Sequence, residues 1–339
     1  MPQKNKLSII VPVYNEVRYL DEFTKSLFSV FNNIDSEYIF VNDGSSDGSK
    51  ELLENINETI ILINLKENKG KGYAIKEGIK ASTGNFLLFQ DADLELDPKD
   101  SLEMYNIIND NNKIDCVFGS RYLSGKLKKN NNYLNEVFVK FNSFLFNILF
   151  RQSLSDLHCG SKIISKKIIN QLNLTIDDFG FEIDIASQIA KNKFDIYEYG
   201  ISYFARSKKE GKKITWIDGI KSYFYLFKTR FLQNEISVIF SIAFTVSYMI
   251  YIASFFGMGL GKYLLIGLFA VIGLFIGLYK KILTSSIIFL FCFIGSLFSK
   301  GNGKIYTVLL GFIIGLYISK KISLSAKKFN SIKLINFFI

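Results

Sequence analysis

The chain changes character near residue 230, and this change is the strongest constraint on its fold. Residues 1–230 mix charged and apolar residues, as the sequence of a globular domain does. Residues 236–319 are almost entirely apolar, with charges confined to short breaks. The first part is long enough for one α/β domain with its own core. We therefore predict a globular domain over residues 1–230, a transmembrane region over residues 236–319 and a tail over residues 320–339.

The predicted membrane region divides into four apolar segments: Ile236–Phe256, Tyr263–Tyr279, Ile282–Phe298 and Ile305–Ile318. The first segment is long enough for a helix that crosses a hydrocarbon core of about 30 Å. The others are shorter, and the fourth is the shortest. A buried helix in a soluble domain is the alternative for each segment. Four such segments in succession, separated by Gly and Lys, favour a C-terminal bundle of about four transmembrane helices.

Positive charge flanks these segments unevenly. One set of flanks holds Lys221, Lys228, Arg230, Lys280, Lys281, Lys320, Lys321, Lys327 and Lys328, whereas the opposite breaks hold only Lys262, Lys300 and Lys304. Because positively charged loops stay in the cytoplasm, we expect an integral, multi-pass membrane protein with its globular domain and both termini cytoplasmic. Residues 1–6 lead directly into a strand pattern, so no cleavable signal sequence is expected.

The net charge of +10 does not by itself indicate a nucleic-acid partner. No basic run interleaved with aromatic residues marks a nucleic-acid module, so we expect no nucleic acid. A protein that lies on anionic lipid also carries positive charge. The three cysteines, Cys116, Cys159 and Cys292, lack metal-type spacing, and we expect them to be reduced.

The globular part alternates strand and helix patterns. Apolar runs predict strands at Leu7–Val13, Glu37–Val41, Ile60–Leu65, Asn85–Gln90 and Asp115–Gly119. Helical spacing or helix-start signals occupy residues 17–31, 49–56 and 70–81 between them. This alternation implies right-handed crossovers and a mainly parallel sheet with both faces covered. The predicted fold class is therefore α/β.

Polar clusters follow three of the predicted strands: Tyr14–Glu16, Asp43–Ser45 and Asp91–Asp93. In open parallel sheets, ligands bind beyond the carboxyl ends of the strands. A single Asp-x-Asp after a strand is more often a turn or a helix cap, but three clusters at one edge favour a shared site. Carboxylate oxygens suit Mg²⁺ or Mn²⁺, and these ions suit a diphosphate.

Five motifs occur in an order that resembles family 2 glycosyltransferases with a GT-A type nucleotide-sugar-binding domain: Val11–Glu16, Asn42–Ser49, Asn68–Tyr73, Gln90–Asp93 and Gly119–Tyr122. Three later segments resemble those of polyprenyl-phosphate sugar transferases, including dolichyl-phosphate mannose and glucose synthases: Asp156–Lys162, Phe179–Asp184 and Tyr203–Trp216. The resemblance implies an inverting enzyme. It would transfer a hexose from a UDP- or GDP-linked sugar to a polyprenyl phosphate on the cytoplasmic leaflet. A homo-oligomer is compatible with the sequence.

The resemblance implies a role for each motif residue. The expected nucleotide-sugar pocket comprises Pro12, Tyr14, Glu16, Asp43, Gly44, Lys71 and Asp91. Asp43 would hold the nucleobase or ribose, and Asp91 would face the ribose or the donor sugar. Lys69 and Lys71 flank a glycine before a helix start, where they could meet phosphate. A solvated position is equally compatible with both lysines.

The metal and the acceptor draw on further residues. Asp93 is the expected first ligand of Mg²⁺ or Mn²⁺ and Glu95 the second, and the ion would stabilise the departing diphosphate. Arg121, Arg206 and Lys212 are the expected contacts of the acceptor phosphate. The expected catalytic residues are Asp91, Asp93, Arg121 and Arg206.

The sequence offers no clear general base. A phosphate monoester, with a second pKa near ~6, is mostly dianionic at pH 7 and can attack unaided. A hydroxyl acceptor, such as a lipid-linked saccharide, is the alternative, with Asp156 and Glu182 as candidate bases. His158 is expected to be structural. A non-catalytic membrane scaffold that only binds nucleotide is a further alternative, which the intact Asp43, Asp91 and Asp93 disfavour.

Two amphipathic segments extend the predicted membrane contact. Residues 133–150 place apolar residues between Lys, Asn and Glu, a pattern typical of helices that lie in a bilayer interface. Packing on the sheet is an equally good interpretation of this segment. Residues 220–231 combine aromatic and basic side chains ahead of the first apolar segment, as membrane-interface anchors do.

Overall fold

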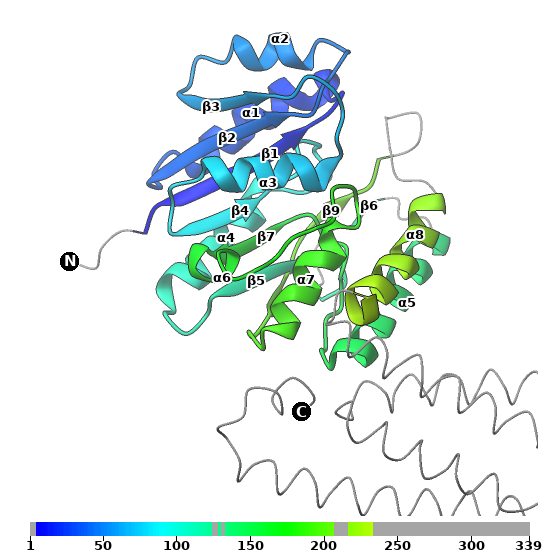
Figure 1. Cartoon of the computed structure of the whole chain (residues 1–339). Helices are drawn as coiled ribbons and strands as arrows, with labels where there is room; N and C mark the ends of the chain where they lie inside the picture. The colour runs from blue at the N-terminus through cyan, green and yellow to red at the C-terminus, as the bar shows by residue number, and fades with distance from the viewer. Residues whose placement is uncertain (1–4, 124–127, 130–132, 207–215, 233–339) are drawn as a thin grey trace, which may run out of the picture. The chain divides into compact units, whose positions relative to one another are not determined.

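The computed structural model describes residues 5–123, 128–129, 133–206 and 216–232 (Figure 1). Met1–Arg230 cluster into one compact unit. Within the described ranges, no helix is both long enough and apolar enough to cross a membrane. The four predicted spans, the predicted tail and Lys212 lie outside the described residues, so they remain predictions.

A seven-stranded sheet forms the centre of the domain, in the order β3-β2-β1-β4-β7-β5-β8 (Figure 1). Its strands are β1 (Leu7–Val13), β2 (Ser36–Asn42), β3 (Ile60–Asn64), β4 (Phe86–Phe89), β5 (Cys116–Ser120), β7 (Lys162–Ser165) and β8 (Tyr197–Gly200). All pairings are parallel except those of β7, which runs antiparallel to both β4 and β5. The predicted α/β class with a mainly parallel sheet is confirmed.

Each of the five predicted strands is present, and its ends differ from the prediction by no more than one residue. The sequence analysis did not predict β7 or β8. A parallel pair, β6 (Lys128–Lys129) and β9 (Tyr203–Phe204), forms a separate small sheet. Backbone hydrogen bonds from Phe204 to Glu95 and from Gly119 to Ser161 connect late segments of the chain to the edge of the main sheet.

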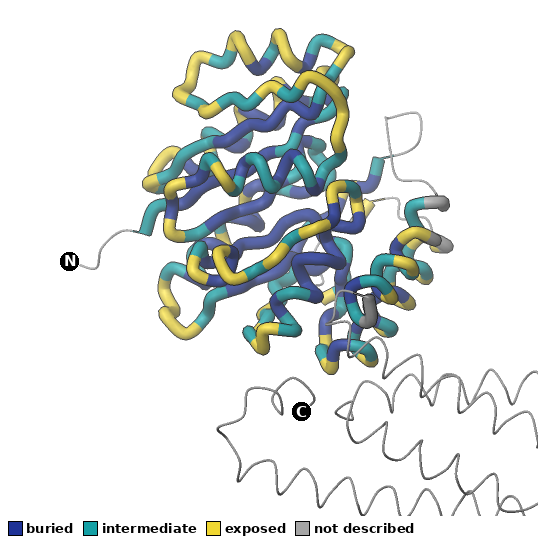
Figure 2. The backbone as a smooth tube through the Cα atoms, in the orientation of Figure 1, coloured by how far each residue is buried: buried dark blue, intermediate teal, exposed yellow. Residues whose placement is uncertain are grey.

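Helices cover both faces of the main sheet. One face packs against α1 (Val17–Phe31), α2 (Ser49–Glu54) and α4 (Pro98–Asp110). The other packs against α3 (Lys71–Ala81), α5 (Tyr133–Phe150), α6 (Lys166–Ile169), α7 (Phe181–Lys191) and α8 (Trp216–Phe227), which continues into a π-helical turn, Lys228–Leu232. Figure 2 shows the buried strands between helices with exposed outer faces.

Strand alternation builds these two cores. In β1, Leu7, Ile9 and Val11 belong to the core under α1 and α4, whereas Ile10 belongs to the core under α3. Successive side chains of a strand point to opposite faces, so one apolar strand supplies both cores.

The α5 and α8 helices lie side by side (Figure 1). The ring centres of Phe138 and Tyr223 lie 5.1 Å apart, and Asn142 Nδ2 donates a 2.6 Å hydrogen bond to Ser222 Oγ. On the inner side of α5, Phe146 is fully buried in the core. The packing interpretation of residues 133–150 is therefore confirmed for this face. The outer side remains rich in exposed aromatic residues, including Phe144, which is 56% exposed.

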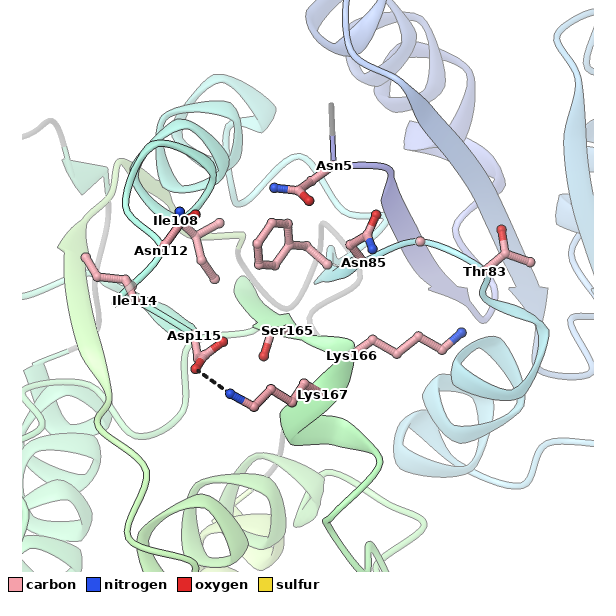
Figure 3. Close-up of a pocket in the computed structure, with 12 residues that line it drawn as sticks. Asn5, Thr83, Asn85, Ile108, Asn112, Ile114, Asp115, Ser165, Lys166 and Lys167 are labelled. Atoms are coloured by element: carbon pink, nitrogen blue, oxygen red, sulfur yellow. Dashed lines mark ion pairs between the residues drawn. The ribbon is translucent and has the colours of Figure 1, made fainter. Parts of the chain in front are cut away.

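A pocket of about 350 Å³ lies at the amino-terminal edge of the sheet (Figure 3). Asn85 and Asp115, which precede β4 and β5, contribute to its lining together with Ser165 and Lys167. An ion pair of 3.9 Å joins Lys167 Nζ to Asp115 Oδ2. Of the predicted site residues that the structure describes, none lines this pocket, because they lie towards the opposite, carboxyl-terminal edge of the strands.

The closest approach of α3 to the sheet depends on Gly78. A Cβ at this position would lie 2.4 Å from Ile10 Cγ2 and 3.4 Å from Val41 Cγ2. We expect Gly78→Ala to lower the free energy of unfolding by about 1–3 kcal/mol through overpacking. Thermal unfolding of the purified protein measures this effect. The control is Lys80→Ala on the exposed side of the same helix, and equal unfolding temperatures for the two variants would contradict the prediction.

Candidate active site

Side-chain hydrogen bonds join the loops after β1 and β2. Asn15, with a positive φ of 50°, receives a 2.8 Å hydrogen bond from the Ser46 amide through its side-chain oxygen. Its own amide donates to Ser45 Oγ at 3.0 Å, and the Glu16 amide donates to Ser49 Oγ at 2.9 Å. These contacts fix the backbone on which Tyr14 and Glu16 are mounted, so the first two predicted clusters do share one edge.

Asp43 binds the loop that precedes α3. Its two carboxylate oxygens accept hydrogen bonds from the Lys69 amide at 2.7 Å and the Gly70 amide at 2.9 Å, and the residue is only 2% exposed. Gly44 has φ +65°, and a Cβ there would lie 2.5 Å from the Glu67 carbonyl carbon. Asp43 thus shapes the loop, and its predicted contact with the nucleobase or ribose remains a prediction.

Asp91 and Lys71 form an ion pair at the end of β4. Lys71 Nζ lies 2.6 Å from Asp91 Oδ1 and 3.0 Å from Glu182 Oε1. The Lys71 side chain is 15% exposed, so the solvated interpretation of this residue is wrong. Lys69 is exposed and lies over the Tyr73 ring at 5.1 Å. The two lysines of one motif therefore have different environments.

Arg206 gathers three carboxylates. Its Nη1 lies 2.7 Å from Glu16 Oε2, its Nη2 lies 2.8 Å from Asp93 Oδ2, and its Nε lies 3.6 Å from Glu95 Oε1. These carboxylates follow β1 and β4, whereas Arg206 follows β9. The sequence analysis assigned Glu16 to the donor, Asp93 and Glu95 to the metal and Arg206 to the acceptor. The structure brings all four together.

Glu95 also anchors the backbone around Arg206. Its Oε1 accepts a 2.8 Å hydrogen bond from the Arg206 amide, and its Oε2 accepts one of 3.1 Å from the Tyr203 hydroxyl. The Glu95 carboxylate is therefore already bonded to the protein through both oxygens. Its predicted role as a metal ligand would have to coexist with these hydrogen bonds.

The cluster is short of positive charge. Burial, followed by the Asp91 and Glu95 carboxylates, raises the pKa of Asp93 well above its ordinary value, and Arg206 offsets this only in part. Among the described residues, no three His, Cys, Asp or Glu side chains form a preassembled metal group. Mg²⁺ usually takes one or two carboxylates together with substrate phosphates. Asp93 with one neighbouring carboxylate fits such a partial ligand set.

Arg121 forms a buried bidentate salt bridge with Asp156. Its Nε and Nη2 lie 2.7 and 2.8 Å from the two Asp156 oxygens, and its amide donates to Oδ2 at 3.1 Å. Burial alone would raise the pKa of Asp156, but the Arg121 guanidinium and its hydrogen bonds hold it below its ordinary value. Both groups are thus bound to each other, whereas Arg121 was expected to contact the acceptor phosphate and Asp156 was a candidate base only for a hydroxyl acceptor.

Tyr203 connects the two arginine sites. The Arg121 guanidinium lies 5.0 Å from the centre of the Tyr203 ring, and the Tyr203 hydroxyl donates to Glu95. Sequence reasoning missed Tyr203 as a contributor, although it stands in the same late segment as Arg206. The signal available was its place in the Tyr203–Trp216 segment, three residues before Arg206.

Lys162 is the first residue of β7, and His158 lies in the segment that precedes this strand. Lys162 is fully buried and pairs with Glu182, and sequence reasoning missed it. Burial lowers the pKa of His158 to about 4, which keeps its imidazole neutral at pH 7. Among the described residues, His158 Nε2 has no hydrogen-bond partner. The His158 amide donates a 3.3 Å hydrogen bond to Asp156 Oδ1, which also accepts a hydrogen bond from Arg121.

Comparison with known proteins relates the globular part of the chain to a known family. Residues 8–172 match the family model described as Glycosyl transferase family 2. A dolichyl-phosphate beta-glucosyltransferase of Dictyostelium discoideum is 27% identical over 219 residues, which cover 58% of this chain and 66% of the relative. A dolichol-phosphate mannosyltransferase of Pyrococcus furiosus is 25% identical over 218 residues, which cover 62% and 60%.

A third relative matches over a shorter stretch. An undecaprenyl-phosphate 4-deoxy-4-formamido-L-arabinose transferase of Proteus mirabilis is 36% identical over 102 residues, covering 28% of this chain and 31% of the relative. The matches to these three curated relatives thus span less than two thirds of the relatives' own lengths.

Solved structures share the fold. Glucosyl-3-phosphoglycerate synthase from Mycobacterium tuberculosis superposes with a TM-score of 0.53 at 15% identity, over 67% of this chain and 80% of that one. At this identity the likeness concerns the fold, and it supports the GT-A type arrangement expected from the motifs. Residues 8–172 therefore form a glycosyl transferase family 2 domain, and the chain is similar to dolichyl- and polyprenyl-phosphate sugar transferases.

Proposed function

We propose that this chain is a membrane-anchored, inverting glycosyltransferase that moves a hexose from a UDP- or GDP-linked sugar to a polyprenyl phosphate at the cytoplasmic leaflet. The observation that carries the proposal is the 2.8 Å contact between Arg206 Nη2 and Asp93 Oδ2. It puts the cation suited to an acceptor phosphate beside the carboxylate suited to the donor diphosphate. The names of the three curated relatives support this acceptor class.

The donor side uses the loops after β1, β2 and β4. Asp43 and Gly44 shape the wall that Pro12 and Tyr14 would complete around the nucleotide. Asp91, held by Lys71, would contact the ribose or the sugar. The Mycobacterium tuberculosis structures that share the fold include complexes with UDP and Mn²⁺, which supports a nucleoside-diphosphate donor and a divalent ion here.

Asp93 would hold Mg²⁺ or Mn²⁺, with Glu95 or Glu16 as a neighbouring carboxylate. A bound ion supplies positive charge to the diphosphate as it leaves. The residues themselves supply a cluster of carboxylates that one guanidinium only partly neutralises. Arg206 shares these oxygens, so a cation would compete with it for Asp93.

The acceptor side favours phosphate over hydroxyl. Asp156, one candidate base, is forked to Arg121, and Glu182, the other, is paired with Lys71 and Lys162. Neither carboxylate is set to take a proton from an alcohol. A phosphate dianion needs no base, so a single direct displacement, with inversion, is the simplest reaction for this site. The ordered contacts of Asp43, Asp91 and Asp93 also disfavour a non-catalytic scaffold.

The α5 and α8 pair offers a surface for the membrane interface. Phe141 and Phe144 of α5 and Phe224 of α8 are 48%, 56% and 57% exposed, and Lys221, three residues before Phe224, is also exposed. Aromatic and basic residues together are typical of helices at a bilayer surface. With the apolar sequence that follows residue 235, they support a multi-pass protein whose catalytic domain and termini are cytoplasmic.

The first prediction from the proposed function concerns the substrates. We expect the purified full chain, with Mg²⁺ or Mn²⁺, to transfer a hexose from one of a panel of UDP- and GDP-sugars to a short polyprenyl phosphate, and not to the corresponding polyprenol. The mass of the lipid product reports the reaction, and chelation of the ion should abolish it. Transfer to the alcohol alone would overturn the acceptor assignment.

The second prediction concerns Asp93. We expect Asp93→Asn to lower kcat by at least about 100-fold, because the ion that stabilises the leaving diphosphate loses its main ligand. Steady-state kinetics with saturating Mn²⁺ measure this loss, and Asp97→Asn, at the cap of α4, is the control. Wild-type turnover by Asp93→Asn would rule out the proposed metal site.

The third prediction separates the two roles of Arg206. Arg206→Ala should raise the KM for polyprenyl phosphate by about tenfold or more, because a charge-assisted contact is lost. The same variant should bind Mn²⁺ more tightly in a direct titration, because the three carboxylates lose their cation. Lys99→Ala, which removes an exposed positive charge from α4, should change neither value. An unchanged acceptor KM would exclude Arg206 from the acceptor site.

A further inference from the structure

Asp91 stands at the outer end of a charge chain, a series of alternating charges (Asp91, Lys71, Glu182 and Lys162) that runs into the domain. Lys71 Nζ lies 2.6 Å from Asp91 Oδ1 and 3.0 Å from Glu182 Oε1, and Lys162 Nζ contacts Glu182 Oε2. The exposed fractions of the side chains fall along this chain, from 27% for Asp91 to 15%, 7% and 0% for Lys71, Glu182 and Lys162. Only the Asp91 end therefore approaches solvent.

Lys162, the inner end of the charge chain, is held by the core. Lys162 also donates to the Cys159 carbonyl and lies 4.9 Å from the centre of the Phe118 ring. The positive charge of Lys162 partly neutralises Glu182. Without it, Glu182 would compete more strongly with Asp91 for the Lys71 ammonium group. Because an unpaired buried charge is costly, each member of the chain depends on the next. Lys71 is the link that passes this constraint to Asp91.

Two glycines aim Lys71 inwards. A Cβ at Gly70 would lie 2.6 Å from the Asp177 carbonyl oxygen, and one at Gly72 would lie 2.5 Å from the Ile176 carbonyl oxygen. The loop before α7 thus packs directly on the start of α3, and the Tyr73 amide donates to Asp177 O at 2.8 Å. This close approach brings Glu182, in the first turn of α7, to Lys71.

A third glycine confines Asp91 from the other side. A Cβ at Gly160 would lie 2.1 Å from Asp91 Oδ2. One carboxylate oxygen of Asp91 is therefore bound by Lys71, and the other lies against the Gly160 backbone. The carboxylate is held in one orientation before any ligand arrives.

We propose that Lys71, Glu182 and Lys162 are positioning residues that hold the Asp91 carboxylate in the orientation in which it receives the sugar moiety of the donor. The inference rests on the proposed function and deepens it. It gives the Gly70-Lys71-Gly72 motif a different role from the phosphate contact predicted from the sequence, because the charge of Lys71 is already matched by Asp91 and Glu182.

The test compares nucleotide with nucleotide sugar in the full chain. Calorimetry gives the Kd of UDP and UDP-glucose, and of GDP and GDP-mannose, for wild type, Asp91→Asn, Lys71→Met and the double variant. The sugar increment is the ratio of the Kd of the nucleotide to that of its sugar. For the pair that wild type binds, we expect Lys71→Met to lower this increment by about tenfold, as Asp91→Asn does, with the nucleotide Kd unchanged.

Kinetics provide a second readout. Lys71→Met should lower kcat by about 10–100-fold with little change in the KM for the acceptor, and the double variant should be no worse than Asp91→Asn alone. Lys69→Met, at the exposed lysine of the same motif, is the matched control. The pair Lys71→Met with Glu182→Gln removes one positive and one negative charge, so it tests the link without a change in net charge. Its sugar increment should match that of Lys71→Met.

Two results would overturn the inference. A tenfold weaker Kd for UDP or GDP alone in Lys71→Met would make Lys71 a diphosphate ligand. Effects of Lys71→Met and Asp91→Asn that multiply in the double variant would mean that the two residues act independently. Binding also separates this inference from the proposed function. A wild type that binds a nucleotide sugar but does not transfer to polyprenyl phosphate refutes only the acceptor assignment.

Discussion

The carboxyl-terminal edge of the sheet depends on the ion pairs that the Arg206 guanidinium forms. The guanidinium touches Glu16, Asp93 and Glu95, which would repel one another without it. The contact with Glu16 joins residues 190 positions apart and ties the end of the globular domain to its beginning. One of these carboxylates, Asp93, is also the proposed ligand of a divalent ion. Structural closure and the chemistry proposed for this edge therefore depend on the same oxygens.

The remaining charges of this edge follow the same principle of internal pairing. Arg121 is matched by Asp156, and Lys71 by Asp91 and Glu182. Ion pairs that are buried and already oriented cost little reorganisation when charge develops in a reaction. They also explain the glycines of the motifs, because Gly44, Gly72 and Gly160 let backbone or carboxylate approach where a Cβ would clash.

Local patterns were sufficient for the strands and for the edge at which the site lies, because strand alternation and strand ends are properties of short segments. Partner choice was not predictable, because it depends on residues far apart in the chain. A lysine between two glycines at a helix start was equally compatible with a phosphate contact and a solvated position, yet Lys71 pairs with Asp91, which follows β4, and Glu182, which lies in α7. Likewise, β7 was missed because its antiparallel course follows from the tertiary placement of Lys162–Ser165, and no crossover pattern marks it.

This pairing also bears on the class of acceptor. Transfer to an alcohol would need a carboxylate with spare basicity, and burial can supply one only where no cation is bound. Asp156 has its pKa lowered by Arg121, and Glu182 lies between two lysines. A phosphate acceptor removes the need for a base and instead requires a cation close to the donor, the role proposed above for Arg206. The site is thus better matched to an acceptor that brings its own negative charge than to one that must lose a proton.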